Sequence, residues 1–164
     1  MDRRDILAAL PVFAGISERD WEKVADLFSE RQYRKDDYIF LEGGAPEALY
    51  VVKSGKVKVL RHSTDGKDVV LRVAGPGQLL GTVAVFDGGG YPGTAQAIEE
   101  CCLLVIARND CLTLVTRFPV FALSVIDDLG GRLRSSAEQI RSLAVERVDE
   151  EAEVGRLDAA LGGH

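Results

Sequence analysis

The stretch of sequence that decides the fold reads Gly77-Gln78-Leu79-Leu80-Gly81-Thr82-Val83-Ala84-Val85-Phe86-Asp87-Gly88-Gly89-Gly90-Tyr91-Pro92-Gly93-Thr94-Ala95-Gln96-Ala97. Eleven of the 17 glycines of the chain lie between positions 43 and 93, and the densest group of them is here. Glycine suits places where the backbone turns tightly or approaches another group closely. Around one short apolar turn, such a segment can present backbone N–H groups to an anion. The stretch therefore predicts an anion-holding loop.

Short strand patterns surround this stretch, from about Glu30 to Ala107. The runs are Tyr38–Leu41, Leu49–Val52, Lys56–Val59, Val69–Leu71, Thr94–Ile98 and Cys102–Ile106. Turn signals separate them, such as Thr64-Asp65-Gly66 and Gly75-Pro76-Gly77. Seven or so short strands at this spacing indicate a sandwich or a small barrel. We predict a mainly β fold with flanking helices, in the α+β class.

Helical patterns flank the β region on both sides. A short helix is expected over Arg3–Leu10, ended by Pro11, and an amphipathic helix over Ile16–Ser29. The latter carries Trp21, Val24, Ala25 and Phe28 on one face, behind a capping box formed by Ser17 and Asp20. After the strands, a short helix from Asn109-Asp110 to Val115 precedes a long one from Pro119 to at least Val148.

The long helix carries a narrow apolar stripe at alternating spacings of three and four residues, made of Ile126, Leu129, Leu133, Ala137, Ile140, Ala144 and Val148. This spacing fits a coiled-coil seam as well as a core face. Gly130-Gly131 lies within the helix and costs about 1 kcal/mol per glycine, so either two backbones pass closely there or the helix bends. The acidic segment after Val148 is interpreted as a fraying helix end or a linker.

Composition excludes several classes of protein. The chain has 164 residues, a net charge of −6 and 28% charged residues, which fits one domain and argues against a surface devoted to nucleic acid. The apolar run Ile6–Ala14 is too short to cross a membrane and has no cleavage site after it, so we expect a cytoplasmic protein. His62 and His164 are the two histidines, which argues against a metalloenzyme, including a cupin-type barrel, and against a catalytic triad. We therefore expect no enzyme activity.

The three cysteines are Cys101, Cys102 and Cys111. Neighbouring residues of a strand point to opposite faces, so Cys101 and Cys102 make a poor disulfide. We interpret all three as buried thiols in a reducing compartment. Oxidation of one thiol of the Cys101-Cys102 pair, on the outer face of the sheet, is the alternative.

Taken in order, the motifs resemble the cyclic-nucleotide-binding-fold sensor domain of the CRP/FNR superfamily of bacterial transcription regulators. They are Leu10-Pro11-Val12-Phe13, Leu49-Tyr50-Val51-Val52-Lys53-Ser54-Gly55-Lys56-Val57, Gly75-Pro76-Gly77, Phe86-Asp87-Gly88-Gly89, Tyr91-Pro92-Gly93-Thr94-Ala95 and the long helix. The resemblance implies an antiparallel double-stranded β-helix, a jelly-roll-like β-roll, followed by a long helix that forms a homodimer. In the family, a small-molecule effector in the roll shifts that helix and reorients a helix-turn-helix domain.

On this basis the chain divides into N-terminal helices (1–29), the β-roll (30–107), a short helix with the dimerisation helix (108–148) and an acidic tail or linker (149–164). The 16 residues after Val148 are too few for a helix-turn-helix, so we expect no DNA binding by this chain alone. The predicted function is effector sensing in a transcription regulator. The alternative is a stand-alone module, with or without a bound cyclic nucleotide.

The resemblance places the candidate ligand-binding residues at Gly81, Thr82, Val83, Ala84, Gly93, Thr94, Ala95 and, on the long helix, Ser136. Cyclic-AMP-binding relatives have a glutamate where this chain has Thr82 and an arginine where it has Gly93. No lysine or arginine lies between Arg72 and Arg108, and a buried phosphate without a basic partner loses its strongest contact. These departures argue against cyclic AMP as the ligand.

The Tyr91–Ala95 segment looks more like that of the FNR- and DNR-type branch, which senses oxygen, nitric oxide or redox state through iron–sulfur or haem. An iron–sulfur cluster is excluded, because its cysteines would precede Cys101. Haem would need His62, the one internal histidine, as its axial ligand. No cofactor is assigned at this point, and both cyclic nucleotide and haem stay open.

Overall fold

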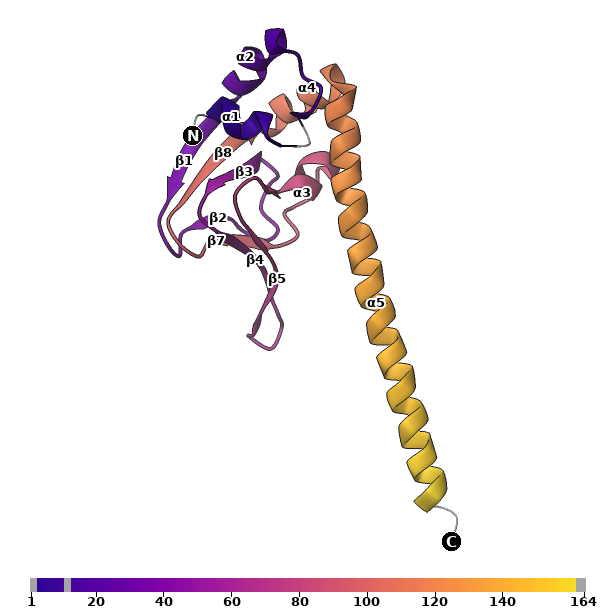
Figure 1. Cartoon of the computed structure of the whole chain (residues 1–164). Helices are drawn as coiled ribbons and strands as arrows, with labels where there is room; N and C mark the ends of the chain where they lie inside the picture. Colours follow the sequence, from indigo (N-terminus) through magenta and orange to yellow (C-terminus); the bar gives the residue numbers. More distant parts are fainter. Residues whose placement is uncertain (1–2, 11–12, 162–164) are drawn as a thin grey trace. The chain divides into compact units, whose positions relative to one another are not determined.

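The strands of the protein form two antiparallel four-stranded sheets that face each other, as the computed structural model of residues 3–10 and 13–161 shows (Figure 1). The first sheet has the order β1-β8-β3-β6, and the second has the order β2-β7-β4-β5. The strands are β1 (Phe28–Tyr33), β2 (Tyr38–Phe40), β3 (Ala48–Ser54), β4 (Val57–His62), β5 (Asp68–Ala74), β6 (Leu79–Leu80), β7 (Thr94–Ala97) and β8 (Cys101–Ala107). The predicted α+β fold with a β-roll is confirmed.

The core lies between the two sheets, where alternate residues of each strand point inward. Its members include Tyr50, Val52, Val57, Val59, Leu80, Ala95, Leu103 and Val105. β8 is buried from Cys101 to Ile106, because it lies between β1 and β3 and because α4 packs against β8 and β3. A strand covered on both faces reads as a continuous apolar run, which is how β8 appears in the sequence.

Five helices accompany the sheets within the described residues: α1 (Arg3–Ala8), α2 (Glu18–Asp26), α3 (Thr82–Asp87), α4 (Arg108–Arg117) and α5 (Pro119–Leu161). Phe13 joins the N-terminal segment to the roll and to the start of α5. Its ring lies 5.9 Å from that of Trp21, 5.8 Å from Phe28 and 5.3 Å from Phe121, centroid to centroid. Pro11, the predicted end of the first helix, lies outside the described residues.

The start of the roll differs from the prediction. α2 ends at Asp26, and Phe28, expected on its apolar face, instead begins β1 opposite Ile106 of β8. Phe28 is buried in either arrangement, so its apolar character did not distinguish them, and the long-range pairing with β8 decides. The capping box also differs: the Ser17 hydroxyl donates to the Asp20 carboxylate at 2.9 Å and makes no side-chain bond to the helix backbone.

The C-terminal helix begins at Pro119 as predicted and extends past Val148 to Leu161. The chain divides into two compact units, residues 1–126 and residues 127–164. In the second unit α5 continues through the acidic segment to Leu161, so residues 149–161 follow the first of the two interpretations, a helix end, and not a linker. Glutamate, alanine and leucine are good helix formers, and an Arg147–Glu151 pair with its charged atoms 4.0 Å apart has the favourable i, i+4 spacing.

The apolar stripe of α5 is largely exposed in this single chain. Ile126, Leu133, Ile140 and Val148 are 63%, 71%, 67% and 62% exposed. Apart from adjacent residues and the backbone of the helix itself, no atom of the described residues lies within 4 Å of a Cβ placed on Gly130 or Gly131, so both positions leave room for a close approach by another backbone. Among the described residues, no helix combines the length and the apolar content needed to cross a bilayer.

Gly55 and Gly66 allow a matched test of the roll. Both have a left-handed backbone, with φ of +86° and +82°. A Cβ on Gly55 would lie 2.4 Å from the Glu100 carbonyl oxygen and 2.9 Å from the Cys101 Cα, whereas a Cβ on Gly66 meets nothing within 4 Å. We expect Gly66→Ala to lower the free energy of unfolding by about 1–2 kcal/mol, and Gly55→Ala by at least about 2 kcal/mol more. Urea denaturation measures both, and equal losses would contradict the packing at Gly55.

Candidate functional site

The first half of the candidate ligand cassette is the sharp turn from β6 into α3. Gly81 has a φ of +86°, and a Cβ there would lie 3.0 Å from Cε1 of Tyr91 and 3.2 Å from the Ala48 carbonyl oxygen, so this position requires glycine. The backbone N–H groups of Thr82, Val83 and Ala84 belong to the first turn of α3, where a helix offers them no acceptor of its own. The turn therefore presents donors that suit an anion or a polar ligand atom.

Tyr91 anchors the second half of the cassette. Its ring stacks on Phe40, with centroids 3.9 Å apart and planes 14° apart. Its hydroxyl donates to the Ala48 carbonyl at 2.8 Å and accepts from the Ala48 N–H at 3.2 Å. Burial raises the pKa of this hydroxyl above its ordinary value, which keeps it protonated as a donor. Tyr91 is thereby tied to β2 and β3, two residues before Gly93.

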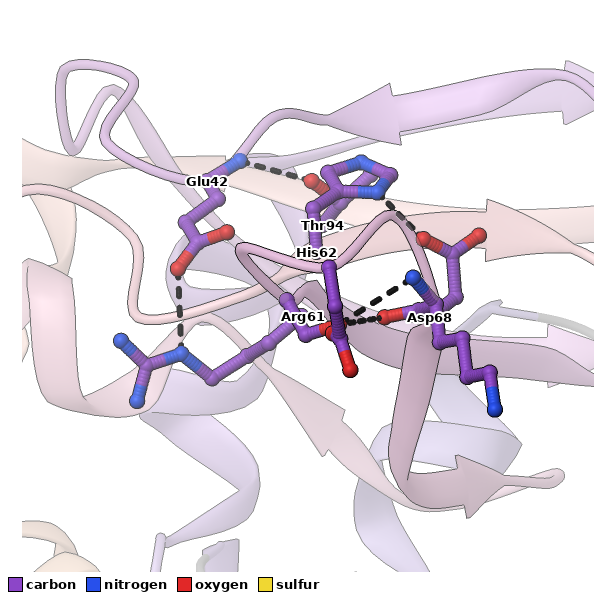
Figure 2. A network of polar contacts seen from close by, with 8 residues as sticks. Glu42, Arg61, His62, Asp68 and Thr94 are labelled. Atoms are coloured by element: carbon purple, nitrogen blue, oxygen red, sulfur yellow. Dashed lines mark hydrogen bonds and ion pairs between the residues drawn. The ribbon is translucent and has the colours of Figure 1, made fainter.

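Backbone bonds then join the cassette to the loop after β2. The Gly43 N–H donates to the Tyr91 carbonyl at 2.8 Å, and the Tyr91 N–H donates to the Gly44 carbonyl at 3.1 Å. The Glu42 N–H donates to the Thr94 hydroxyl oxygen at 2.9 Å, and the Glu42 carboxylate accepts from Nε of Arg61 at 3.0 Å (Figure 2). The entry to β7 is held in place by these contacts.

Two buried hydroxyl groups distinguish the cassette. Thr82 and Thr94 are each 1% exposed. Thr94 accepts the bond from Glu42, whereas the structure gives Oγ1 of Thr82 no hydrogen-bond partner among the described residues. A buried hydroxyl without a partner costs about 1–3 kcal/mol. Sequence analysis identified Thr82 as a departure from the family but missed its burial.

The packing around Gly93 explains why no arginine stands there. A Cβ on Gly93 would lie 2.9 Å from Cγ1 of Val59, 3.0 Å from the Leu60 carbonyl oxygen and 3.5 Å from Cδ1 of Leu71. A long side chain at this position would need β4 and β5 to move. The absence of the family's arginine is therefore built into the packing of the second sheet.

The structure places the other candidates as follows. Ala84, Gly93 and Ala95 are buried, and Val83 is 39% exposed on α3. The two halves of the cassette meet where Gly81 touches Tyr91. Ser136 is an exposed residue of α5 in the second unit. A ligand role for these residues stays a prediction.

The described residues provide neither a buried histidine as an axial ligand for haem nor a group of side chains that could hold a metal ion. His62 lies on the β4–β5 hairpin with its side chain 56% exposed, and its Nδ1 lies 2.5 Å from the Asp68 carboxylate (Figure 2). Such a side chain does not supply the sheltered axial ligand that haem needs. Among the residues that the structure describes, no group of three or more His, Cys, Asp and Glu side chains is arranged to hold a metal ion.

The cysteines are all buried, Cys102 included, although the alternative interpretation placed one thiol of the pair on an accessible outer face. Burial raises the pKa of the Cys101 and Cys102 thiols above their ordinary values, and raises that of Cys111 to about 12. The thiolate is the reactive form, so these cysteines are poor redox sensors. The structure therefore argues for the interpretation as buried thiols.

Comparison with known proteins gives a consistent set of relatives. The family model for the cyclic nucleotide-binding domain matches residues 30–118. The chain is 33% identical over 136 residues to the cyclic AMP receptor protein of Thermus thermophilus, a match that covers 83% of this chain and 63% of that protein.

Two solved structures resemble the fold. The Thermus thermophilus catabolite activator protein has a TM-score of 0.75 and 33% identity, over 82% of this chain and 63% of that one. The sensor domain of the transcriptional regulator DNR from Pseudomonas aeruginosa has a TM-score of 0.72 and 23% identity, over 82% and 91%, and supports the fold alone. This chain thus spans less than two thirds of the Thermus protein.

Replacing Thr82 or Thr94 by valine should change the free energy of unfolding in opposite directions. Thr82→Val removes an unpaired buried hydroxyl while keeping its volume, so it should raise the free energy of unfolding of the ligand-free protein by about 1 kcal/mol. Thr94→Val leaves the Glu42 N–H without its acceptor and should lower it by about 1 kcal/mol. Chemical denaturation of both variants measures the difference, and a loss of stability in Thr82→Val equal to that in Thr94→Val would show that Oγ1 of Thr82 is paired.

Proposed function

The chain belongs to the cyclic nucleotide-binding domain family, and from this premise we propose that it is the effector-sensing part of a cytoplasmic transcription regulator of the CRP/FNR type. In this role it is not an enzyme: it binds a small molecule in the roll and passes the signal on. Because it spans 63% of the Thermus receptor, the activity of the whole regulator is part of the proposal. DNA binding would come from another part of such a regulator, not from the residues discussed here.

The observation that carries this proposal is the backbone geometry of the cassette, which is kept although the family's glutamate and arginine are absent. Gly81 keeps the left-handed turn that exposes the first N–H groups of α3, and Tyr91 holds the second half against β2 and β3. The unpaired Thr82 hydroxyl supports a polar ligand there, because binding would supply the missing hydrogen bond. A cyclic nucleotide, or a closely similar phosphate ester, is the ligand class that these groups fit best. The assignment to the FNR- and DNR-like branch stays a prediction.

The stripe on α5 supports the second part of the proposal, which is that two copies pair through this helix. A helix that exposes Leu133 and Ile140 at 71% and 67% gains stability when a second apolar stripe covers it. The effector would act by favouring one of two arrangements of the helix pair, as a two-state element requires. Ser136, in the same region of α5, is the candidate ligand residue that the family resemblance assigns to the helix.

Ligand binding should be visible as a thermal shift of the purified chain. Cyclic AMP or cyclic GMP at 100 times its dissociation constant adds about 2.7 kcal/mol to the free energy of unfolding. For a chain of this size, that corresponds to a rise in Tm of about 5–10 °C. AMP, whose phosphate is not cyclic, serves as the control and should give a smaller rise. No shift with either cyclic nucleotide would contradict the proposed ligand class.

The helix pairing should depend on the stripe and not on apolar surface in general. Leu133→Asn with Ile140→Asn places polar groups in the seam, and we expect the dimer to dissociate to monomers in sedimentation velocity. Val145→Asn is the matched control, because Val145 is 54% exposed on α5 and lies about 120° around the helix from Leu133. Unchanged sedimentation of the double variant, or dissociation of the control to the same extent, would contradict the proposed seam.

A further inference from the structure

Strand β5 carries a charged side chain on the face that it turns toward the inside of the roll. In the antiparallel pairing of β4 with β5, Arg72 lies opposite Val59, and Ala74 lies opposite Val57. Side chains that lie opposite each other in such a pair share a face of the sheet. Val57, Val59 and Ala74 all belong to the core between the sheets. Arg72, which is half-buried, therefore also extends toward that interior.

The guanidinium of Arg72 crosses to the other sheet beside the first half of the cassette. Its Nη2 donates to the carbonyl oxygen of Leu79 at 3.0 Å. Leu79 is in β6, two residues before Gly81 and three before the buried Thr82. A cation is thus held close to the turn whose N–H groups begin α3.

The second half of the cassette is adjacent to the same side chain. A Cβ placed on Gly93 would lie 2.9 Å from Cγ1 of Val59 and 3.5 Å from Cδ1 of Leu71. Val59 is the cross-strand partner of Arg72, and Leu71 precedes Arg72 in β5. The pairing of β4 with β5 shifts by one residue here, between Val59 and Leu60, so Leu71 is the extra residue of a bulge. The bulge places Leu71 toward Gly93 and leaves Arg72 in register with the core.

The chemistry of these groups fits an anion. A guanidinium carries five N–H donors in a planar fork that matches the oxygens of a phosphate ester. The unpaired hydroxyl of Thr82, 1% exposed, is an independent sign that a polar ligand atom belongs at the same turn. The linear sequence does not show this role, because Arg72 lies just before the stretch without basic residues and the face of β5 that carries it depends on the pairing with β4.

We propose that Arg72 is the specificity-determining cation beside the cassette and receives the anionic phosphate of the ligand, in place of an arginine at position 93. The inference rests on the proposed function, since it assumes that the roll binds a phosphate ester. Arg72 would give the phosphate of a cyclic nucleotide the charge-assisted contact that residues 73–107, which contain no lysine or arginine, do not provide. The positive charge that binds the phosphate would then come from β5 and not from the cassette.

Isothermal titration of the full chain with cyclic AMP tests the proposal. Arg72→Gln removes the charge while keeping a polar side chain of similar length, and should weaken binding by about 10- to 100-fold, the loss expected for a charge-assisted hydrogen bond. Lys58→Gln is the matched control. It removes the same charge from the neighbouring strand β4, where Lys58 lies opposite Val73 on the face of the strand pair that points away from the core, and should change the dissociation constant by less than about threefold.

Arg72→Lys covers the case in which the glutamine variant does not fold, as judged by circular dichroism. Lysine keeps the charge without the planar fork, so binding should be weaker than wild type by about 3- to 10-fold. Wild-type affinity in Arg72→Gln, or in Arg72→Lys when the glutamine variant does not fold, would overturn the inference and leave the proposed function standing. A larger loss in Lys58→Gln than in Arg72→Gln would do the same. Absence of cyclic AMP and cyclic GMP binding by the wild-type chain would overturn both.

Discussion

The buried contacts of Tyr91 are the interaction on which the rest of the site depends. One side chain stacks on Phe40 of β2, bonds through its hydroxyl to Ala48 of β3 and fills the space in front of Gly81. The phenol oxygen is paired in both directions, as donor and as acceptor, so its burial carries no unsatisfied group. The cassette is thereby held against β2 and β3, which precede it by several elements in the sequence.

The packing around the cassette also determines where a basic side chain can lie near it. β4 and β5 press on Gly93 so closely that the position accepts no side chain, yet the bulge at Leu71 keeps Arg72 directed toward the core. In a sequence comparison, glycine in place of arginine at position 93 is a loss of the basic partner of the ligand. In the structure, a basic side chain is present near the cassette, but it comes from Arg72 on β5. Whether a family member keeps a binding property therefore depends on sheet register as much as on the residue at the equivalent position.

The two units of the chain obey different physical constraints. Residues up to 126 enclose a core between two sheets, and the strands satisfy their backbone groups by pairing within the sheets. Residues from 127 onward are one helix that exposes Leu133, Ile140 and Val148. An isolated helix gains little from propensity alone, and most helical stability in proteins comes from packing an apolar face. The helix is therefore the part of this chain whose stability most depends on something outside it.

Features with a local cause were determined by the sequence alone. The turn glycines, the strands around Val51, Val59 and Ile106, the long helix and the order of the family motifs depend on backbone conformation and on periodicity, which are written in consecutive residues. Only the tertiary structure decided which residues meet. It made Phe28 begin a strand, because pairing with β8 outweighs a helical pattern. It buried Cys102, because β8 lies between β1 and β3 and the Glu30 side chain of β1 lies against the thiol. It also turned Arg72 inward. These outcomes depend on which strand lies beside which and in what register, and no window of sequence contains both partners.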